Sequence, residues 1–133
     1  MWACTHVYVQ PVRGGEPALE SICIERNPKV LVSDFISVLE EGFLRHGIET
    51  RVVDRAAGED CQYVVSYTAL RSWDMAPFMN YAEVRVTREG TTIGTATYSH
   101  GGGFGFNKWR GTRAKMDPVI DELLSNYGST PSE

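Results

Sequence analysis

The chain has 133 residues, of which 42% are hydrophobic and 23% are charged. This length suits one domain around a single core, and the composition excludes a chain that is disordered throughout. The formal net charge of -4 at pH 7 argues against a nucleic acid as partner, because such binding draws most of its affinity from Lys and Arg side chains that neutralise phosphates.

The first part of the chain predicts two short strands. Residues 6–12 (HVYVQPV) alternate and carry β-branched and aromatic side chains, as strands do, and the following RGGEP stretch ends them. Residues 19–25 (LESICIE) have the same character. We therefore expect two strands before the chain changes its periodicity.

A long amphipathic helix is predicted over residues 28–46. Apolar residues recur there at helical spacing of three and four: Leu31, Phe35, Val38, Leu39, Gly42 and Phe43. Asn27 is a residue type that caps helices, Pro28 suits the first helical position, and Gly47 suits the stop. The apolar stripe is expected to face the core.

Four further strands are predicted at residues 49–54, 61–73, 80–89 and 91–100, with a turn at Glu89-Gly90. Short connections between consecutive strands favour an antiparallel meander. A second helix follows, with these expected features: Asp117 as cap, Pro118 in the first turn, Val119, Ile120, Leu123 and Leu124 as the apolar stripe, and Gly128 as the stop.

The expected fold is α+β: four to six mostly antiparallel strands, with two helices packed on one face of the sheet. Residues 1–5 are expected to be the remnant of an N-terminal anchor and residues 6–128 a single domain. Residues 129–133 are expected to form a disordered tail.

The stretch GGGFGFNKW at residues 101–109 resembles the RNP1 motif of RNA-recognition domains. However, Gly102 stands where that motif has Lys or Arg, and three successive glycines make a poor central strand. The stretch also lacks the Gly-Lys-Ser/Thr ending of a phosphate-binding loop. We interpret it as a loop whose aromatic and basic side chains either pack on the edge of the core or contact a partner: Phe104, Phe106, Lys108, Trp109 and Arg110.

Candidate catalytic and metal-binding residues are few. His6, His46 and His100 lie in separate predicted elements, without the spacing of a metal site. Ser99 and His100 are adjacent on a strand, so that their side chains point to opposite faces. We therefore expect no metal, no cofactor and no enzymatic activity.

The sequence has three cysteines, and we interpret them as one single cysteine and one bonded pair. Cys4 follows a small residue near the N-terminus, whereas Cys23 and Cys61 lie in or beside predicted strands. We predict a disulfide between Cys23 and Cys61, which requires an oxidising compartment. Two buried thiols in a cytoplasmic core are the alternative.

The stretch ACTHVYVQPV, the cysteine pair and the order of elements resemble small Gram-negative envelope lipoproteins with a compact α+β domain. The resemblance implies a lipid on Cys4, and Thr5 directly after that cysteine is compatible with sorting to the outer membrane. It further implies a non-enzymatic module on the periplasmic side of the outer membrane that binds an envelope protein or acts in assembly. A small cytoplasmic domain that binds a protein or ligand is the alternative, and an enzyme or an RNA-binding domain ranks below both.

Overall fold

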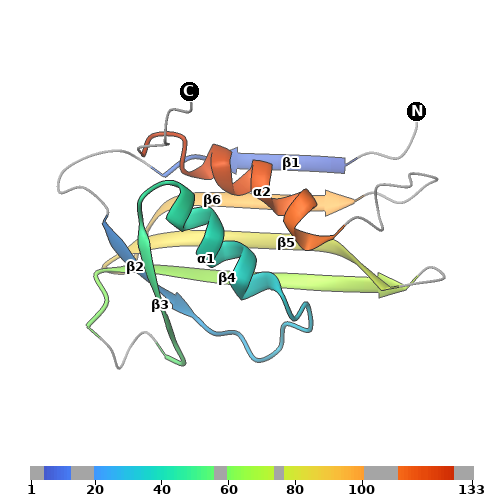
Figure 1. Cartoon of the computed structure of the whole chain (residues 1–133), viewed down its shortest axis with the longest axis horizontal. Helices are drawn as coiled ribbons and strands as arrows, with labels where there is room; N and C mark the ends of the chain where they lie inside the picture. Colours follow the sequence, from blue (N-terminus) through green and yellow to red (C-terminus); the bar gives the residue numbers. More distant parts are fainter. Residues whose placement is uncertain (1–4, 13–19, 56–59, 74–76, 101–110, 128–133) are drawn as a thin grey trace.

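The computed structural model describes residues 5–12, 20–55, 60–73, 77–100 and 111–127. It confirms the expected α+β class, with a mixed sheet and two helices on one of its faces (Figure 1). The elements are β1 (Thr5–Gln10), β2 (Ser21–Glu25), α1 (Phe35–Arg45), β3 (Glu49–Val53), β4 (Tyr63–Trp73), β5 (Pro77–Arg88), β6 (Thr91–His100) and α2 (Thr112–Leu123).

The sheet has six strands in the order β1-β6-β5-β4-β2-β3. The predicted meander is confirmed for β4, β5 and β6, which are successive antiparallel neighbours. It is wrong for β3, which pairs in parallel with β2 at the edge of the sheet instead of with β4. Glu89 and Gly90, both with positive φ, form the turn between β5 and β6. β2 lies parallel to both β4 and β3. The connection from β2 to β3 contains α1, because parallel strands need a crossover of this kind.

Alternation along the strands explains why the helices cover only one face. Val65, Tyr67 and Ala69 on β4 are buried, and the residues between them are only partly buried. They lie opposite buried residues of β5 in the pairs Val65–Val86, Tyr67–Val84 and Ala69–Ala82. The core therefore forms between this side of the sheet and the helices, and the other side faces solvent.

The N-terminal boundary predicted for the first helix is wrong. α1 begins at Phe35 rather than at Pro28, and Leu31 is 66% exposed. Asn27 does not cap a helix, because its backbone N–H donates to Tyr67 Oη and its side-chain amide donates to the Tyr67 carbonyl. The rest of the predicted stripe is buried, and Gly47 ends the helix with a positive φ, as expected.

The predicted start of the second helix is also wrong. α2 begins at Thr112 after Gly111, so Asp117 and Pro118 lie inside it. The extra first turn is held by tertiary contacts: Thr112, Lys115 and Met116 are buried, and Thr112 Oγ1 donates to Asp34 Oδ1 at 2.8 Å. These contacts outweigh the helical hydrogen bond that Pro118 cannot donate. Gly128, the predicted stop, lies outside the described residues.

The two helices approach closely where Gly42 of α1 faces Ile120 of α2. A Cβ atom on Gly42 would lie only 2.7 Å from Ile120 Cγ2. Glycine therefore sets the distance between the helices, which meet over the core (Figure 1). Within the described residues, no helix is both long enough and apolar enough to cross a membrane.

Candidate functional site

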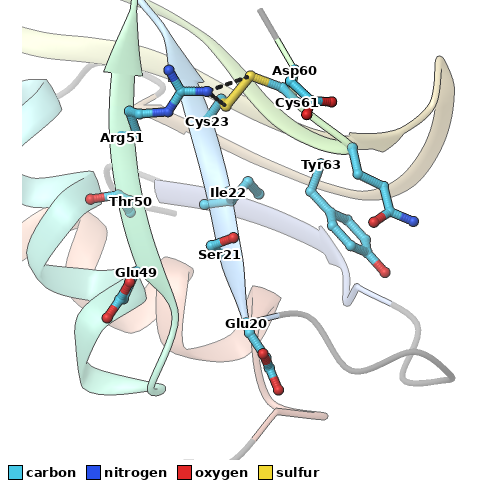
Figure 2. Close-up of a pocket in the computed structure, with 11 residues that line it drawn as sticks. Glu20, Ser21, Ile22, Cys23, Glu49, Thr50, Arg51, Asp60, Cys61 and Tyr63 are labelled. Carbon is cyan, nitrogen blue, oxygen red and sulfur yellow. Dashed lines mark hydrogen bonds between the residues drawn. A yellow bond between two sulfur atoms is a disulfide. The ribbon is translucent and has the colours of Figure 1, made fainter.

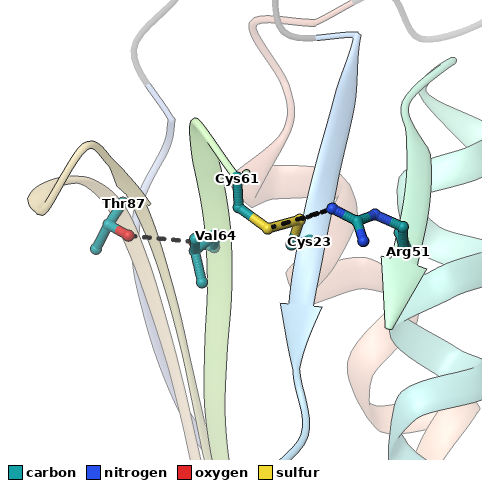
Figure 3. Close-up of a disulfide and its surroundings, with 5 residues drawn as sticks. All are labelled: Cys23, Arg51, Cys61, Val64 and Thr87. Carbon is teal, nitrogen blue, oxygen red and sulfur yellow. Dashed lines mark hydrogen bonds between the residues drawn. A yellow bond between two sulfur atoms is a disulfide. The ribbon is translucent and has the colours of Figure 1, made fainter. Parts of the chain in front are cut away.

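The structure contains the predicted disulfide between Cys23 on β2 and Cys61, which precedes β4 (Figure 3). The two Cα atoms are 6.0 Å apart. Parallel pairing of β2 with β4, in which Cys23 lies opposite Val64, brings the two segments together. Disulfides are rare in the reducing cytoplasm, so this bond indicates an extracytoplasmic location.

Arg51 covers the disulfide from the neighbouring strand. It lies directly opposite Cys23 in the pairing of β3 with β2. Figure 3 shows the Arg51 guanidinium beside the disulfide. Its Nη2 nitrogen lies 3.6 Å from Cys23 Sγ and 3.7 Å from Cys61 Sγ. The guanidinium thereby shields the sulfur atoms on the face of the sheet opposite the helices.

An open groove of about 690 Å³ lies at this end of the sheet, with the disulfide and Arg51 in its wall (Figure 2). Three carboxylates, from Glu20, Glu49 and Asp60, also line it. The groove therefore has charges of both signs, on the residue before β2, on β3 and on the segment before β4. This arrangement identifies no particular ligand.

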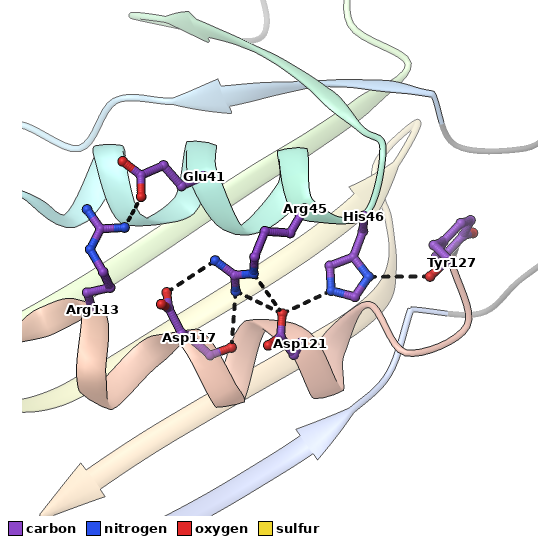
Figure 4. Close-up of polar contacts among 7 residues, drawn as sticks. All are labelled: Glu41, Arg45, His46, Arg113, Asp117, Asp121 and Tyr127. Atoms are coloured by element: carbon purple, nitrogen blue, oxygen red, sulfur yellow. Dashed lines mark hydrogen bonds and ion pairs between the residues drawn. The ribbon is translucent and has the colours of Figure 1, made fainter. Parts of the chain in front are cut away.

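A polar cluster joins the end of α1 to α2 (Figure 4). Arg45 Nη2 donates to Asp121 Oδ1 at 2.8 Å, and Arg45 Nη1 lies 3.5 Å from Asp117 Oδ1. The buried His46 ring lies between two acceptors, with Nε2 3.0 Å from Asp121 Oδ1 and Nδ1 3.3 Å from the Tyr127 carbonyl oxygen. These contacts join the ends of both helices.

The environment shifts two pKa values in this cluster. Partial burial raises the pKa of Asp121, but the hydrogen bonds and charges of Arg45 and His46 outweigh it and leave the pKa below its ordinary value. Partial burial likewise lowers the pKa of Arg45, whereas its contacts with Asp121 outweigh that effect and raise it. Glu41 and Arg113 form a further ion pair between the helices (Figure 4).

At the end of the sheet away from the disulfide, α2 packs on β5 and a lysine is buried between them. Lys115 Nζ donates to the Met79 carbonyl at 3.0 Å and lies 5.5 Å from the centre of the Phe78 ring. His100 packs edge-on against the same ring. Burial lowers the pKa of Lys115. These contacts fix α2 to β5, and the lysine here has a structural role.

Several residues singled out in the sequence lie outside the described residues. They are Cys4, the predicted lipidation site, and the loop residues Phe104, Phe106, Lys108, Trp109 and Arg110. The three histidines are not brought together. His6 is exposed on β1, His46 is buried beside Asp121, and His100 is buried beside Phe78. Among the described residues, no group of three or more His, Cys, Asp or Glu side chains could hold a metal ion.

Sequence reasoning missed Arg51 as the partner of the disulfide. Alternation alone places its side chain on the face opposite Val52. Its position beside Cys23 depends on parallel pairing of two strands separated by α1, for which the sequence has no local signal. Sequence reasoning also did not predict that β1 and β3 are the edge strands, because the strand order depends on the same long-range pairing.

No known family model matches this chain, and no curated protein matches it. Several solved structures share its fold, and two of them are structures of PelC. A PelC dodecamer from Paraburkholderia phytofirmans is 14% identical with a TM-score of 0.61, over 92% of this chain and 96% of the PelC chain. A dodecamer of a PelC variant from the same organism is 13% identical with the same TM-score, over 92% and 95% of the respective chains.

Proposed function

We propose that this chain is a non-enzymatic lipoprotein that acts in envelope assembly on the periplasmic side of the outer membrane, anchored by a lipid on Cys4. Several copies of the chain associate in this role. The proposal has three parts, namely the anchor, the absence of a reaction and the association of copies, and a different feature supports each.

The disulfide carries the proposal. It indicates an extracytoplasmic location and uses Cys23 and Cys61. Cys4 is then the one cysteine of the sequence outside the pair. Because β1 starts at Thr5, directly after Cys4, a lipid on Cys4 would hold the first strand of the sheet close to the membrane surface.

The polar clusters support a binding or assembly role rather than catalysis. The Arg45–Asp121–His46 cluster joins the two helices, and Lys115 joins α2 to β5. In both places the titratable side chains form hydrogen bonds that hold elements of the same chain together. The groove at the disulfide is lined by charges of both signs beside a bonded cysteine pair, and Arg51 contacts that pair.

The association of copies is supported by the shared fold. Both PelC structures are dodecamers, and the likeness covers nearly the whole PelC chain. This chain therefore shares most of the fold of the PelC subunits in those assemblies, and we propose that it associates through the same kind of repeated contact between copies.

The anchor is tested by expressing the gene with its own upstream DNA in a Gram-negative host and measuring the intact mass and detergent partitioning of the mature protein. We expect a mature chain that begins at Cys4, carries acyl groups there and partitions into detergent. Cys4→Ala should abolish both properties, whereas the control Cys23→Ala/Cys61→Ala should retain them. A mature chain that begins at Met1 with a free Cys4 thiol rejects the anchor.

A further inference from the structure

The two edges of the sheet differ from its interior in what they offer to another chain. β1 and β3 are the outermost strands, and among the described residues no strand pairs with the outer side of either (Figure 1). A free edge presents unpaired N–H and C=O groups and is a template for a strand of another molecule. Folded proteins commonly block such edges with charged residues, proline or bulges.

β1 has none of these blocking features. Its six residues, Thr5–Gln10, include no Lys, Arg, Asp, Glu or Pro. Val7 is 45% exposed and Tyr8 is 63% exposed. An uncharged edge strand with exposed apolar side chains is a surface that favours pairing with another strand.

The hydrogen bonds of β3 show which of its backbone groups face outward. The Glu49 N–H donates to the Glu20 carbonyl, and the Val53 carbonyl accepts from the Arg26 N–H. In a parallel pair, alternate residues direct both backbone groups toward the same neighbour, so Glu49, Arg51 and Val53 face β2. Thr50 and Val52 therefore direct their N–H and C=O groups toward the free edge.

The directions of the two edge strands are compatible with one repeated contact. β1 is antiparallel to β6, the meander reverses direction twice more, and β2 and β3 run parallel to β4. β1 and β3 consequently run in opposite directions. A neighbouring copy in the same orientation would thus meet the β1 edge with its β3 in antiparallel alignment. The strands also match in length, with six residues in β1 and five in β3.

We propose that β1 of one copy pairs antiparallel with β3 of a second copy of this chain, so that copies join head-to-tail through their sheet edges. The inference rests on the association of copies under the proposed function and names the surfaces that make it. Unlike a symmetric contact, a head-to-tail contact uses two different surfaces and closes into a ring when the rotation allows.

The position of the anchor favours this pairing over the symmetric one. In an antiparallel pair of two β1 strands, the Thr5 ends would lie at opposite ends of the interface. In the head-to-tail arrangement all copies share one orientation, so the Thr5 end of every β1 faces the same side. Every Cys4, one residue earlier in the sequence, would then be directed toward one membrane.

The test uses the full chain with its disulfide formed and measures mass in solution by sedimentation velocity. Val7→Lys/Tyr8→Lys places charges on the β1 edge at two exposed positions. Thr50→Pro removes an outward N–H from the β3 edge without removing a bond to β2. Leu44→Lys, at a side chain on α1 that is 65% exposed, is the matched control.

We expect the wild type and Leu44→Lys to associate, and each edge variant alone to sediment as a single chain of 14.8 kDa. An equimolar mixture of the two edge variants should form a dimer, because each retains one intact edge of opposite kind. If Thr50→Pro alone still forms the wild-type assembly, head-to-tail pairing is overturned while association of copies stands. If the wild type itself is a single chain, both are overturned, and the anchor is judged separately by its own experiment.

Hydrogen exchange on the wild type gives a second test that does not depend on a variant folding. The amides of Thr50 and Val52 should exchange freely in dilute protein and become protected as concentration rises. The amide of Glu49, which donates to the Glu20 carbonyl, and that of Arg51, which faces β2, should be protected throughout. Thr50 and Val52 amides that stay unprotected in the assembled protein would overturn the proposed contact.

Discussion

Cys23, Cys61 and Arg51 form a small structural unit that ties three strands together. The disulfide links β2 to the segment before β4, and Arg51 extends the unit to β3. β2 and β3 are short, with five residues each. The covalent bond closes a loop that contains α1, and with it most of the parallel part of the sheet.

Removing the disulfide should destabilise the protein by about 4 kcal/mol, because the sequence separation of 38 residues sets the entropy that the bond removes from the unfolded chain. The measurement is urea unfolding of the wild type, with and without reductant, and of Cys23→Ala/Cys61→Ala. Reductant should lower the unfolding midpoint of the wild type and leave that of the double variant unchanged. Equal stability of the oxidised wild type and the double variant would show that the bond contributes nothing.

At the scale of elements, the contact between α1 and α2 depends on side-chain volume and on one charged group. Gly42 leaves no room for a methyl group beside Ile120, whereas Asp121 accepts hydrogen bonds from two residues of the α1 end. The first contact sets how closely the helices approach, and the second makes their association dependent on pH.

Gly42→Ala should destabilise the wild type, since overpacking costs roughly 1 to 3 kcal/mol and outweighs the gain in helix propensity of about 1 kcal/mol. In an Ile120→Ala background the contacts at 2.7 Å and 3.1 Å with Cγ2 and Cδ1 disappear and only the 3.3 Å contact with Cβ remains. The same change should then stabilise, by up to about 1 kcal/mol. Chemical unfolding of the four proteins measures this reversal of sign. A change of the same sign in both backgrounds would show that Ile120 does not set the approach of the helices.

Asp121 should contribute stability at neutral pH that is lost in acid. Its pKa is lowered in the folded state, so the contribution is complete above the unfolded pKa of about 3.9. It disappears as the pH falls through the lower folded value. The difference in unfolding free energy between wild type and Asp121→Asn should therefore shrink below about pH 4. Asp54→Asn, at an exposed ion pair with Arg26, should show little difference at any pH, as exposed pairs contribute little.

Local patterns in the sequence predicted the elements well and their starting points poorly. The strand at 91–100 and the buried part of the first helix were correct, because alternation and helical spacing report burial directly. The starts at Pro28 and Asp117 were wrong, because Asn27 bonds to Tyr67 and Thr112 bonds to Asp34 across long stretches of sequence. Capping preference is a weaker signal than such tertiary contacts.

The candidate site was predicted only in part for the same reason. The cysteine pair was found by counting cysteines and placing both in or beside predicted strands, and the structure contains the bond. Arg51 and the free sides of β1 and β3 depend on which strands are neighbours. That order follows from the packing of the whole sheet and leaves no local trace in the sequence.

At the scale of the whole molecule, helices cover one face of the sheet, and no strand of the described residues pairs with the outer side of either edge strand. The helices occupy one face (Figure 1), while half-buried side chains such as Thr95, Thr97 and Ser99 of β6 alternate with the core residues toward the other face. Within the part of the chain that the structure describes, a single copy thus buries its core and has no strand paired with the outer side of β1 or β3. Association through those edges would complete the hydrogen bonding of the sheet without exposing or rearranging the core.

The position of β1 also affects the order in which the chain can fold. β1 is the first strand along the chain, yet its neighbour is β6, the last strand, through pairs such as Thr5 with His100. When the chain emerges from its N-terminus, β1 therefore has no partner strand until almost the whole chain is available, and contacts between such distant segments form slowly. Until then both edges of β1 are without a partner strand, and β6 of a second, incompletely folded chain can pair with it instead. Exchange of β1 between chains is thus the misfolding route that this topology favours.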